Sequence, residues 1–441
     1  MLSSITIIIG IAAIAASADI PANIRPDNVT NTTSSALNPF GTGFLLSNSS
    51  SGYVYNATGN LTSPEPRPYT PSGGLANNGS VPNYHPLTDY DYESLLLVLY
   101  QEFMELDLFE FGLRTFSVGE FERVGLDAND RALIEFMAEQ ERGHVMLIEN
   151  ILGPSAINRC NYTYPFTSVV EFVDFCRKVT RWGESGVYGF LEHLDSRASA
   201  QLLLQTVTTD ARQEMIFRQF EGLFPMPVWF QTGITQSMAW TLLAPYIAGC
   251  SMDSPRLAWQ NFPALNITNN PNPAAPNATS PSNATLSTAS ATAPFSNFTG
   301  LPGGSNITGS NFTIIPGITS NRTGFTFPGN VVQLAGDFPG KPVGPNNSYT
   351  TNSSAGAPRF AAWISQLNTT YTVLENVQNG TNGWTATTRQ PGDTIWPNVS
   401  ETIVNGSMFI LATDANISVT PYNISELNPH VVAGPAVYFA G

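Results

Sequence analysis

Four helical patterns in the middle of the sequence each place an acidic residue inside an apolar face. Glu102 has apolar residues four and seven positions away on both sides, which is the spacing of one helix face. Glu141 has the same surroundings, and His144 follows it on that face. Glu184 and Asp210 share faces with large apolar residues in the third and fourth patterns. Burying several carboxylates in one core costs several kcal/mol per ion unless positive charge pairs with them.

Divalent cations supply such charge in one known four-helix arrangement. Two of its helices contribute a Glu each, the other two contribute a Glu-x-x-His each, and all these side chains point into the bundle. Glu141 and His144 have this spacing, in which both side chains face one way. The alternative interpretation is an ordinary buried polar pair that is hydrogen-bonded across the bundle.

These side chains require four long helices to position them. The apolar periodicity and the capping residues predict an antiparallel four-helix bundle, with a fifth helix packed against it. The predicted helices are 92–116, 131–152, 169–193 and 197–223, followed by 235–248.

Residues 90–222 resemble the ferritin-like four-helix superfamily. Within it they are most similar to secreted fungal stress-response proteins, which in turn resemble plant desiccation-related proteins. The strings that carry the resemblance are Leu99-Tyr100-Gln101-Glu102-Phe103-Met104-Glu105, Glu141-Arg142-Gly143-His144-Val145, Trp182-Gly183-Glu184-Ser185-Gly186-Val187-Tyr188-Gly189-Phe190 and Asp210-Ala211-Arg212-Gln213.

The resemblance implies a set of metal ligands and a metal, iron or manganese. Glu102 matches the ligand of the first helix, and Glu141 with His144 matches the pair of the second helix. Glu184 matches the acid of the third helix, within one residue of register, and Asp210 matches the first ligand of the fourth. The fourth helix departs from the pattern, because Gln213 stands where the superfamily has His. A mononuclear, degenerate or lost site is therefore an alternative, and a bundle without metal fits the sequence equally well.

The start of the chain predicts secretion. Residues 5–16 form an apolar run that is too short to span a bilayer, and Ala16-Ser17-Ala18 is a small-residue cleavage pattern. We therefore expect residues 1–18 to be a signal peptide and the mature protein to be secreted or held in the cell wall. A membrane-spanning segment is not expected, because no other apolar run in the sequence reaches about 18 residues.

Secretion would make the Asn-x-Ser/Thr motifs glycan acceptors. The chain has 22 of these motifs: six lie before the helical region, fifteen lie after it, and one lies in a predicted inter-helix loop. The predicted acceptors include Asn28, Asn31, Asn48, Asn56, Asn60, Asn78, Asn161, Asn266, Asn277, Asn283, Asn297, Asn306, Asn311, Asn321 and Asn368. Glycans at these positions would supply solubility that charge does not, since only 12% of the residues are charged.

Composition divides the chain into parts. The net charge of −15 disfavours nucleic-acid and anionic-membrane partners. We expect an irregular arm at 19–85, the ferritin-like bundle at 86–250, a linker rich in Asn, Thr, Ser and Pro at 251–310, and a sandwich-like β-rich domain at 311–441. The predicted strands include 312–315, 331–334, 361–364 and 408–411. Three cysteines, Cys160, Cys176 and Cys250, predict one disulfide, but the sequence does not select the pair.

Three classes of function remain open at this point. The first is a secreted or cell-surface glycoprotein that acts in stress response, contacts cell-wall components and carries a degenerate bundle site. The second is a secreted di-metal oxidase or peroxide-handling enzyme, in which iron or manganese would activate oxygen. The third is an extracellular metal-binding protein without catalysis. The missing histidine and the dense acceptor motifs favour the first class, and the oligomeric state is not determined by the sequence.

Overall fold

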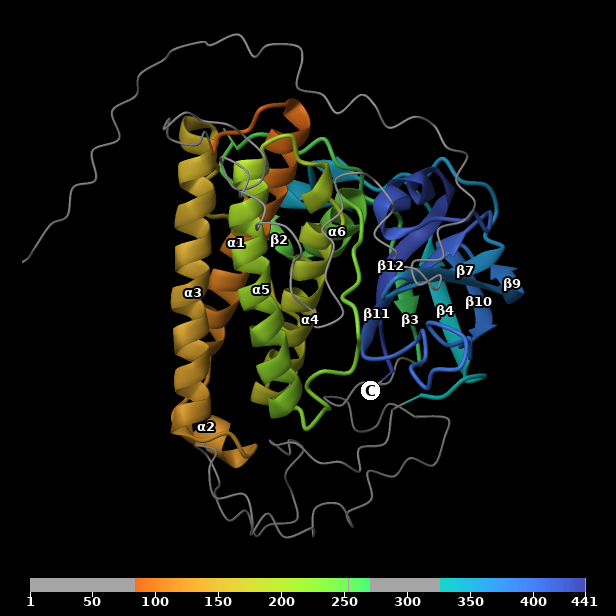
Figure 1. Cartoon of the computed structure of the whole chain (residues 1–441), viewed down its shortest axis with the longest axis horizontal. Coiled ribbons are helices and arrows are strands. Elements are labelled where there is room, and N and C mark those ends of the chain that lie inside the picture. The colour runs from red at the N-terminus through yellow and green to blue at the C-terminus, as the bar shows by residue number, and fades with distance from the viewer. Residues whose placement is uncertain (1–83, 253, 270–325, 441) are drawn as a thin grey trace, which may run out of the picture. The chain divides into compact units, whose positions relative to one another are not determined.

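A computed structural model describes residues 84–252, 254–269 and 326–440. In this part of the chain, a helical bundle is followed by a region of β-sheets (Figure 1). This architecture confirms the predicted fold class, a multidomain chain with an all-α bundle and a β-rich C-terminal region. None of the described helices combines the length and the apolar composition needed to cross a membrane.

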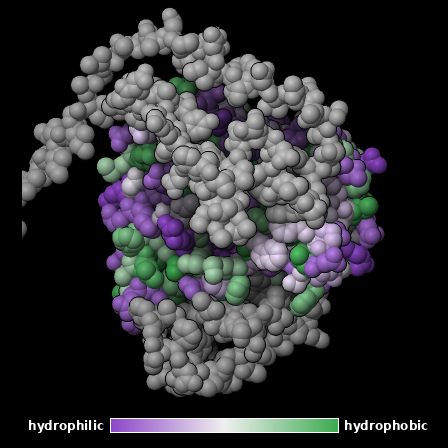
Figure 2. Space-filling model, in the orientation of Figure 1, coloured by the Kyte–Doolittle hydropathy of each residue, from purple (hydrophilic) through white to green (hydrophobic). Residues whose placement is uncertain are grey.

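Four long helices form the bundle and lie side by side in Figure 1. They are α1 (Asp89–Thr115), α3 (Ala128–Leu152), α4 (Val169–Tyr188) and α5 (Arg197–Phe220). A short helix, α2 (Val118–Arg123), follows α1. The predicted fifth helix is present as α6 (Gln236–Leu243), which contacts α1 and α4, but it ends before the predicted residue 248, since residues 244–246 form a 3₁₀ turn and a strand follows. The helix α1 contacts both α3 and α4, and almost every residue from Ser94 to Phe109 is buried. It is therefore the central helix. The helix α3 exposes charged side chains such as Glu139 together with apolar ones such as Phe136. Figure 2 shows hydrophilic and hydrophobic residues mixed on the visible surface.

Capping residues start the helices close to the predicted positions. Thr88, Asp127, Ser168 and Ser196 each accept a hydrogen bond from a backbone N–H in the first turn of the helix that follows. The helix α4 ends at Tyr188, before the predicted end at residue 193, and residues 191–193 form a 3₁₀ turn. The chain turns there because a loop crosses at Gly189.

Gly189 is a point of close backbone contact between α4 and the segment that precedes α6. A Cβ atom at this position would lie 1.7 Å from the carbonyl oxygen of Ile234. Only glycine permits such an approach, so the loop can close over the end of α4 and lead into α6.

The β region contains two four-stranded antiparallel sheets. One has the order β3-β4-β10-β9 and the other has the order β12-β11-β7-β8. Trp384 of the first sheet and Trp363 of the second lie in one buried apolar cluster, which is the core of a sandwich. The strands are β3 (Leu265–Ile267), β4 (Val331–Asp337), β7 (Phe360–Ser365), β8 (Asn368–Val373), β9 (Glu375–Asn379), β10 (Gly383–Arg389), β11 (Ser407–Thr413) and β12 (Val431–Phe439). Two smaller antiparallel pairs join β1 (Asn161–Tyr162) to β2 (Ile247–Gly249) and β5 (Pro342–Val343) to β6 (Tyr349–Thr350).

Three of the predicted strand segments, 331–334, 361–364 and 408–411, lie in β4, β7 and β11. The predicted linker differs from the structure at its N-terminal end. Residues 265–267 form β3 and pair with β4, because the alternation of Leu265, Asn266 and Ile267 suits an edge strand. Three predicted segments lie outside the described residues: the irregular arm up to residue 83, the linker from residue 270 onward, and the strand 312–315.

The strand β11 joins the bundle core to the sandwich core. All seven of its residues are buried. Phe409 and Leu411 belong to the core cluster of the helices, whereas Met408 and Ile410 belong to the sandwich cluster. Because successive side chains of a strand point to opposite faces, an uninterrupted apolar run is what this doubly covered strand requires.

Buried arginines of α4 reinforce this junction. The Arg177 guanidinium donates a hydrogen bond of 2.9 Å to the Ser407 hydroxyl and lies 4.1 Å from the ring centroid of Phe439. Arg181 Nε donates a hydrogen bond of 3.1 Å to the Ser407 carbonyl. The junction is therefore polar at one end of β11 and apolar along its length.

A disulfide links Cys160, in the loop between α3 and α4, to Cys250, which follows β2. The third cysteine, Cys176, is free and buried in α4. The structure thus selects the pair that the sequence left open. The pairing of β1 with β2 brings these two segments together, although 90 positions separate the cysteines.

Candidate metal centre

Four side chains from three helices meet in the interior of the bundle. Glu102 comes from α1, Glu141 and His144 come from α3, and Asp210 comes from α5; all four are buried. His144 Nδ1 lies 3.3 Å from Glu102 Oε2, 3.3 Å from Glu141 Oε2 and 3.4 Å from Asp210 Oδ1. The ligand atoms of Glu102, Glu141 and His144 all lie within 4.8 Å of one another.

This geometry suits a bound cation better than a set of hydrogen bonds. One Nδ1–H group can donate well to a single acceptor, and a charge-assisted hydrogen bond usually measures about 2.7–2.9 Å. The three Nδ1–oxygen distances are longer and nearly equal. Ligand atoms that surround one divalent cation at about 2.1 Å are separated from each other by roughly 3.0–3.4 Å. The three distances from His144 Nδ1 are of this size, and the ligand atoms that all lie within 4.8 Å of one another are those of Glu102, Glu141 and His144.

Two acceptor atoms at the centre also lack a hydrogen bond within the described residues. They are Asp210 Oδ1 and Gln213 Oε1. The other side of the Gln213 amide is engaged, because its Nε2 donates a hydrogen bond of 2.5 Å to Glu141 Oε1. A buried acceptor without a donor is costly, and a cation would satisfy it. The residues present thus fit a divalent metal.

Burial and mutual repulsion shift the pKa values of these groups. Burial raises the pKa of Glu102 to about 8, although His144 opposes the shift. Burial, followed by the charges of Glu141 and Glu102, raises the pKa of Asp210 well above its ordinary value. Burial alone would lower the pKa of His144, but the carboxylates of Glu102 and Glu141 outweigh it and raise that pKa to about 12. His144 is therefore the cation that partners the carboxylates when no metal does.

Glu105 is a fifth member of the centre, one turn along α1 from Glu102. It is buried, and its Oε1 has no hydrogen-bond partner among the described residues. Burial, together with the charges of Glu141 and Glu102, raises the pKa of its carboxyl well above the ordinary value. The signal for it was present in the sequence, because residues three positions apart share a helix face.

A small cavity adjoins the carboxylates. Its volume is about 20 Å³, and its walls include Glu102, Glu105 and Asp210 as well as Gly183 and Gly186 of α4. Because about 10–15 Å³ is enough for one water molecule, the cavity has room for one ligand of that size. The glycines leave this space open beside the candidate ligands.

The structure places Glu184 away from this centre. It is buried in α4, and its Oε1 accepts a hydrogen bond of 2.5 Å from Arg181 Nη1. Burial raises the pKa of its carboxyl to about 8, and Arg181 opposes the shift. Gly183 faces the α1 side instead, since a Cβ there would lie 2.7 Å from Gln101 Nε2. Arg181 was not predicted as a partner of Glu184, although its position three residues earlier in the sequence was an available signal.

Most of the predicted glycan acceptors lie outside the described residues. Asn161 in β1 and Asn266 in β3 are exposed, and Asn368 begins β8. The predicted acceptors at positions 28–78 and 277–321 lie outside the part of the chain that the structure describes.

Comparison with known proteins defines the class of the bundle. A family model of the ferritin-like domain matches residues 90–223, which span the four long helices. The bundle is therefore a ferritin-like domain.

The full chain also has a relative of nearly the same extent. It is 48% identical over 391 residues to protein rds1 of Schizosaccharomyces pombe (strain 972 / ATCC 24843), and the match covers 88% of this chain and 90% of that protein. The chain thus belongs to the same family as protein rds1, and the similarity includes the β region as well as the bundle.

Proposed function

We propose that this protein binds one divalent metal ion, iron or manganese, in its ferritin-like bundle. Glu102, Glu141, His144 and Asp210 would hold the ion. The observation that carries the proposal is the position of His144 Nδ1, which lies at nearly equal distances from carboxylate oxygens of Glu102, Glu141 and Asp210. Carboxylates with one imidazole form a mostly hard ligand set, which suits iron and manganese. A bound metal of this kind supplies redox or Lewis-acid chemistry.

One ion, rather than two, is supported by the residues around the centre. Arg181 provides the positive charge that Glu184 would otherwise need from a second metal. Gln213 uses its amide nitrogen on Glu141 and so blocks that oxygen from another ion. The protein residues around the site exclude bulk water, since all the carboxylates are buried, and the small cavity admits one ligand.

We further propose that the protein is secreted, carries N-linked glycans and acts at the cell surface or in the wall during stress response. The apolar leader and the acceptor motifs support secretion. The disulfide between Cys160 and Cys250 supports it too, because such bonds persist in oxidising compartments. Exposure of Asn161 and Asn266 agrees with a role as glycan acceptors. Catalysis, as in a metal oxidase or a peroxide-handling enzyme, is the second candidate, and the cavity beside the carboxylates favours it.

Elemental analysis of the purified full chain tests metal binding. The wild type is expected to hold about one iron or manganese ion per chain, and Glu141→Gln/His144→Gln is expected to hold almost none. Glu139→Gln is the matched control, because that carboxylate lies on the exposed face of α3. Less than about 0.2 ions per wild-type chain after metal reconstitution would contradict the proposal, and about two ions would contradict the single-ion site.

A mass measurement before and after glycosidase treatment of protein from a eukaryotic secretory host tests the second part. We expect secretion into the medium and a mass loss that corresponds to many glycans. Retention of an unmodified chain inside the cell would contradict the assignment to the surface.

A further inference from the structure

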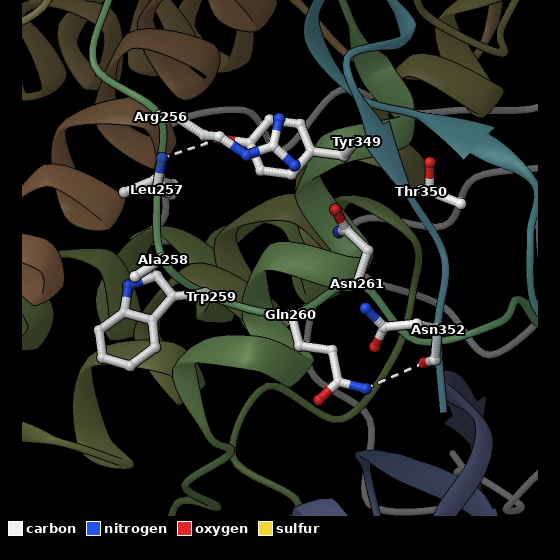
Figure 3. A pocket seen from close by; sticks show the side chains of 9 residues that line it. All are labelled: Arg256, Leu257, Ala258, Trp259, Gln260, Asn261, Tyr349, Thr350 and Asn352. Carbon is white, nitrogen blue, oxygen red and sulfur yellow. Dashed lines mark hydrogen bonds between the residues drawn. The ribbon is translucent and has the colours of Figure 1, made fainter. Parts of the chain in front are cut away.

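A second cavity lies away from the bundle core, between the segment that follows Cys250 and the chain around β6. Its volume is about 360 Å³, within the range of small-molecule sites. Figure 3 shows the side chains that line it, which are mainly amides, a hydroxyl and aromatic rings. Among the residues that the structure describes, its lining contains no carboxylate and a single cation, Arg256.

Two aromatic side chains of the lining are held in place by polar contacts. The Tyr349 hydroxyl accepts a hydrogen bond of 2.8 Å from the backbone N–H of Leu257. The Arg256 guanidinium lies 3.8 Å from the centroid of the Tyr349 ring and donates a hydrogen bond to the Ser348 carbonyl. Trp259 donates its indole N–H to the Glu93 carbonyl at 3.0 Å. The rings therefore form preorganised walls.

The most informative atom is a buried acceptor at the base of the cavity. Asn261 is only 2% exposed, and its Nδ2 donates a hydrogen bond of 3.1 Å to the Trp240 carbonyl. Its Oδ1 has no hydrogen-bond partner within the described residues. Figure 3 shows this amide pointing into the space between Tyr349 and Asn352. An acceptor buried without a donor favours a ligand that brings an O–H or N–H group.

Other groups around the cavity offer further polar contacts. Gln260 Nε2 donates a hydrogen bond of 2.9 Å to the Asn352 carbonyl, so its Oε1 can accept from a ligand. The hydroxyl of Thr350 and the side-chain amide of Asn352 lie in the exposed part of the wall. The lining thus combines donors and acceptors with aromatic surfaces and one positive charge, that of Arg256.

We propose that this cavity binds a neutral saccharide. Sugar hydroxyl groups both donate and accept, which matches amides and a threonine hydroxyl, and the apolar side of a sugar ring can contact an aromatic ring. A hydroxyl can donate to Asn261 Oδ1, and the Arg256 guanidinium is already engaged with the Tyr349 ring and the Ser348 carbonyl. This inference goes beyond the proposed metal site and does not depend on it.

The saccharide has two sources with the same chemistry. Asn352-Ser353-Ser354 is itself an acceptor motif, and Asn352 is exposed at the rim of the cavity. A glycan attached there would begin beside the cavity, and this source rests on the proposed secretion. The other source is a separate saccharide, such as a wall polymer.

Titration of the full chain, made in the bacterial periplasm, tests the cavity itself. There the disulfide can form and N-linked glycans are not added. Calorimetry with chitobiose, mannobiose and cellobiose is expected to show saturable binding of at least one of them. Gln260→Ala/Thr350→Ala is expected to weaken that binding at least about tenfold, because each lost hydrogen bond is worth about a factor of ten. Gln378→Ala, on the exposed face of β9, should leave it unchanged.

The outcomes separate the proposal from its rivals. If none of the three saccharides binds to the bacterial protein, or if the double variant binds as well as the wild type, the proposal is overturned. In protein secreted from a eukaryotic host, Ser354→Ala removes the acceptor motif and keeps Asn352. Binding that appears only in this variant assigns the cavity to the protein's own glycan, and equal binding in both proteins assigns it to a separate saccharide.

Discussion

His144 is the cation closest to three buried carboxylates of the bundle, so its replacement should be costly in the metal-free protein. The variant His144→Gln keeps a polar side chain of similar length but removes the positive charge. Burial would raise the pKa of Glu141, but the hydrogen bond and the charge of His144 outweigh burial and lower that pKa, so Glu141 is the carboxylate that is ionised beside the imidazolium. At 3.3 Å and an effective dielectric constant of about 20, this charge pair represents a gross attraction of about 5 kcal/mol. Burial of the imidazolium offsets part of this attraction. A net loss of about 3–5 kcal/mol of unfolding free energy is therefore expected, as when one partner of a buried pair is removed.

Urea denaturation in the presence of EDTA, followed by tryptophan fluorescence, measures this loss. His193→Gln is the matched control, because this second histidine is partly exposed and makes a hydrogen bond of 2.8 Å to the Tyr422 carbonyl. The control should cost no more than about 1 kcal/mol. Manganese at about one hundred times its dissociation constant should stabilise the wild type by about 2.7 kcal/mol, and should stabilise His144→Gln less at the same concentration.

A small effect would refute this reasoning. If His144→Gln loses only about 1 kcal/mol in EDTA, the histidine contributes no more than an ordinary hydrogen bond, and the carboxylates do not depend on its charge. If manganese stabilises the variant and the wild type equally, His144 is not a metal ligand.

Three further predictions concern the scaffold. Cys160→Ser/Cys250→Ser should lower the unfolding free energy by about 4.5 kcal/mol, because the disulfide closes a loop across a sequence separation of 90 and so lowers the entropy of the unfolded chain. Equal stability of the wild type under reducing and oxidising conditions would contradict this prediction. Gly189→Ala should destabilise by about 3 kcal/mol or more in thermal melts because its Cβ would overlap a backbone oxygen, whereas Gly143→Ala, with open space around it on exposed α3, should stabilise by about 0.5–1 kcal/mol. Hydrogen bonds to the N-cap region lower the pKa of Glu171 below its ordinary 4.5. The ionised Glu171 carboxylate therefore stabilises the folded state fully above pH 4.5, and this stabilisation is lost as the pH falls through the lowered pKa. In urea titrations, Glu171→Ala should lower the unfolding free energy by about 1 kcal/mol at pH 7 and by almost nothing at pH 2.

The helices and part of the site were predictable because they depend on local periodicity. Apolar residues four and seven positions away fixed the inward faces of Glu102 and Glu141, and the structure brings both together with His144. The strand β11 was predictable as a strand from its apolar run. Its burial between two cores was not, because an apolar run alone does not say what covers each face.

Glu184 and Glu105 show where periodicity stops being sufficient. Both lie near an apolar face in sequence, and both are buried. The helix α4 is rotated about its axis so that Gly183, and not Glu184, faces α1, and the Glu184 carboxylate accepts a hydrogen bond from Arg181. The rotation of a helix about its axis is set by its packing against neighbours, and these come from distant parts of the chain.

The sequence by itself determined the order of the long helices, the inward carboxylates of the first two, and the separation of a helical region with one acceptor motif from flanking regions rich in these motifs. Only the tertiary structure decided which cysteines pair, which acids gather around His144, and that Asn261 Oδ1 finds no hydrogen-bond donor in the described part of the chain. The physical reason is the range of the interactions. Faces and caps follow from residues within a few positions of each other, whereas pairing, charge compensation and cavities depend on side chains that folding brings together from far along the chain.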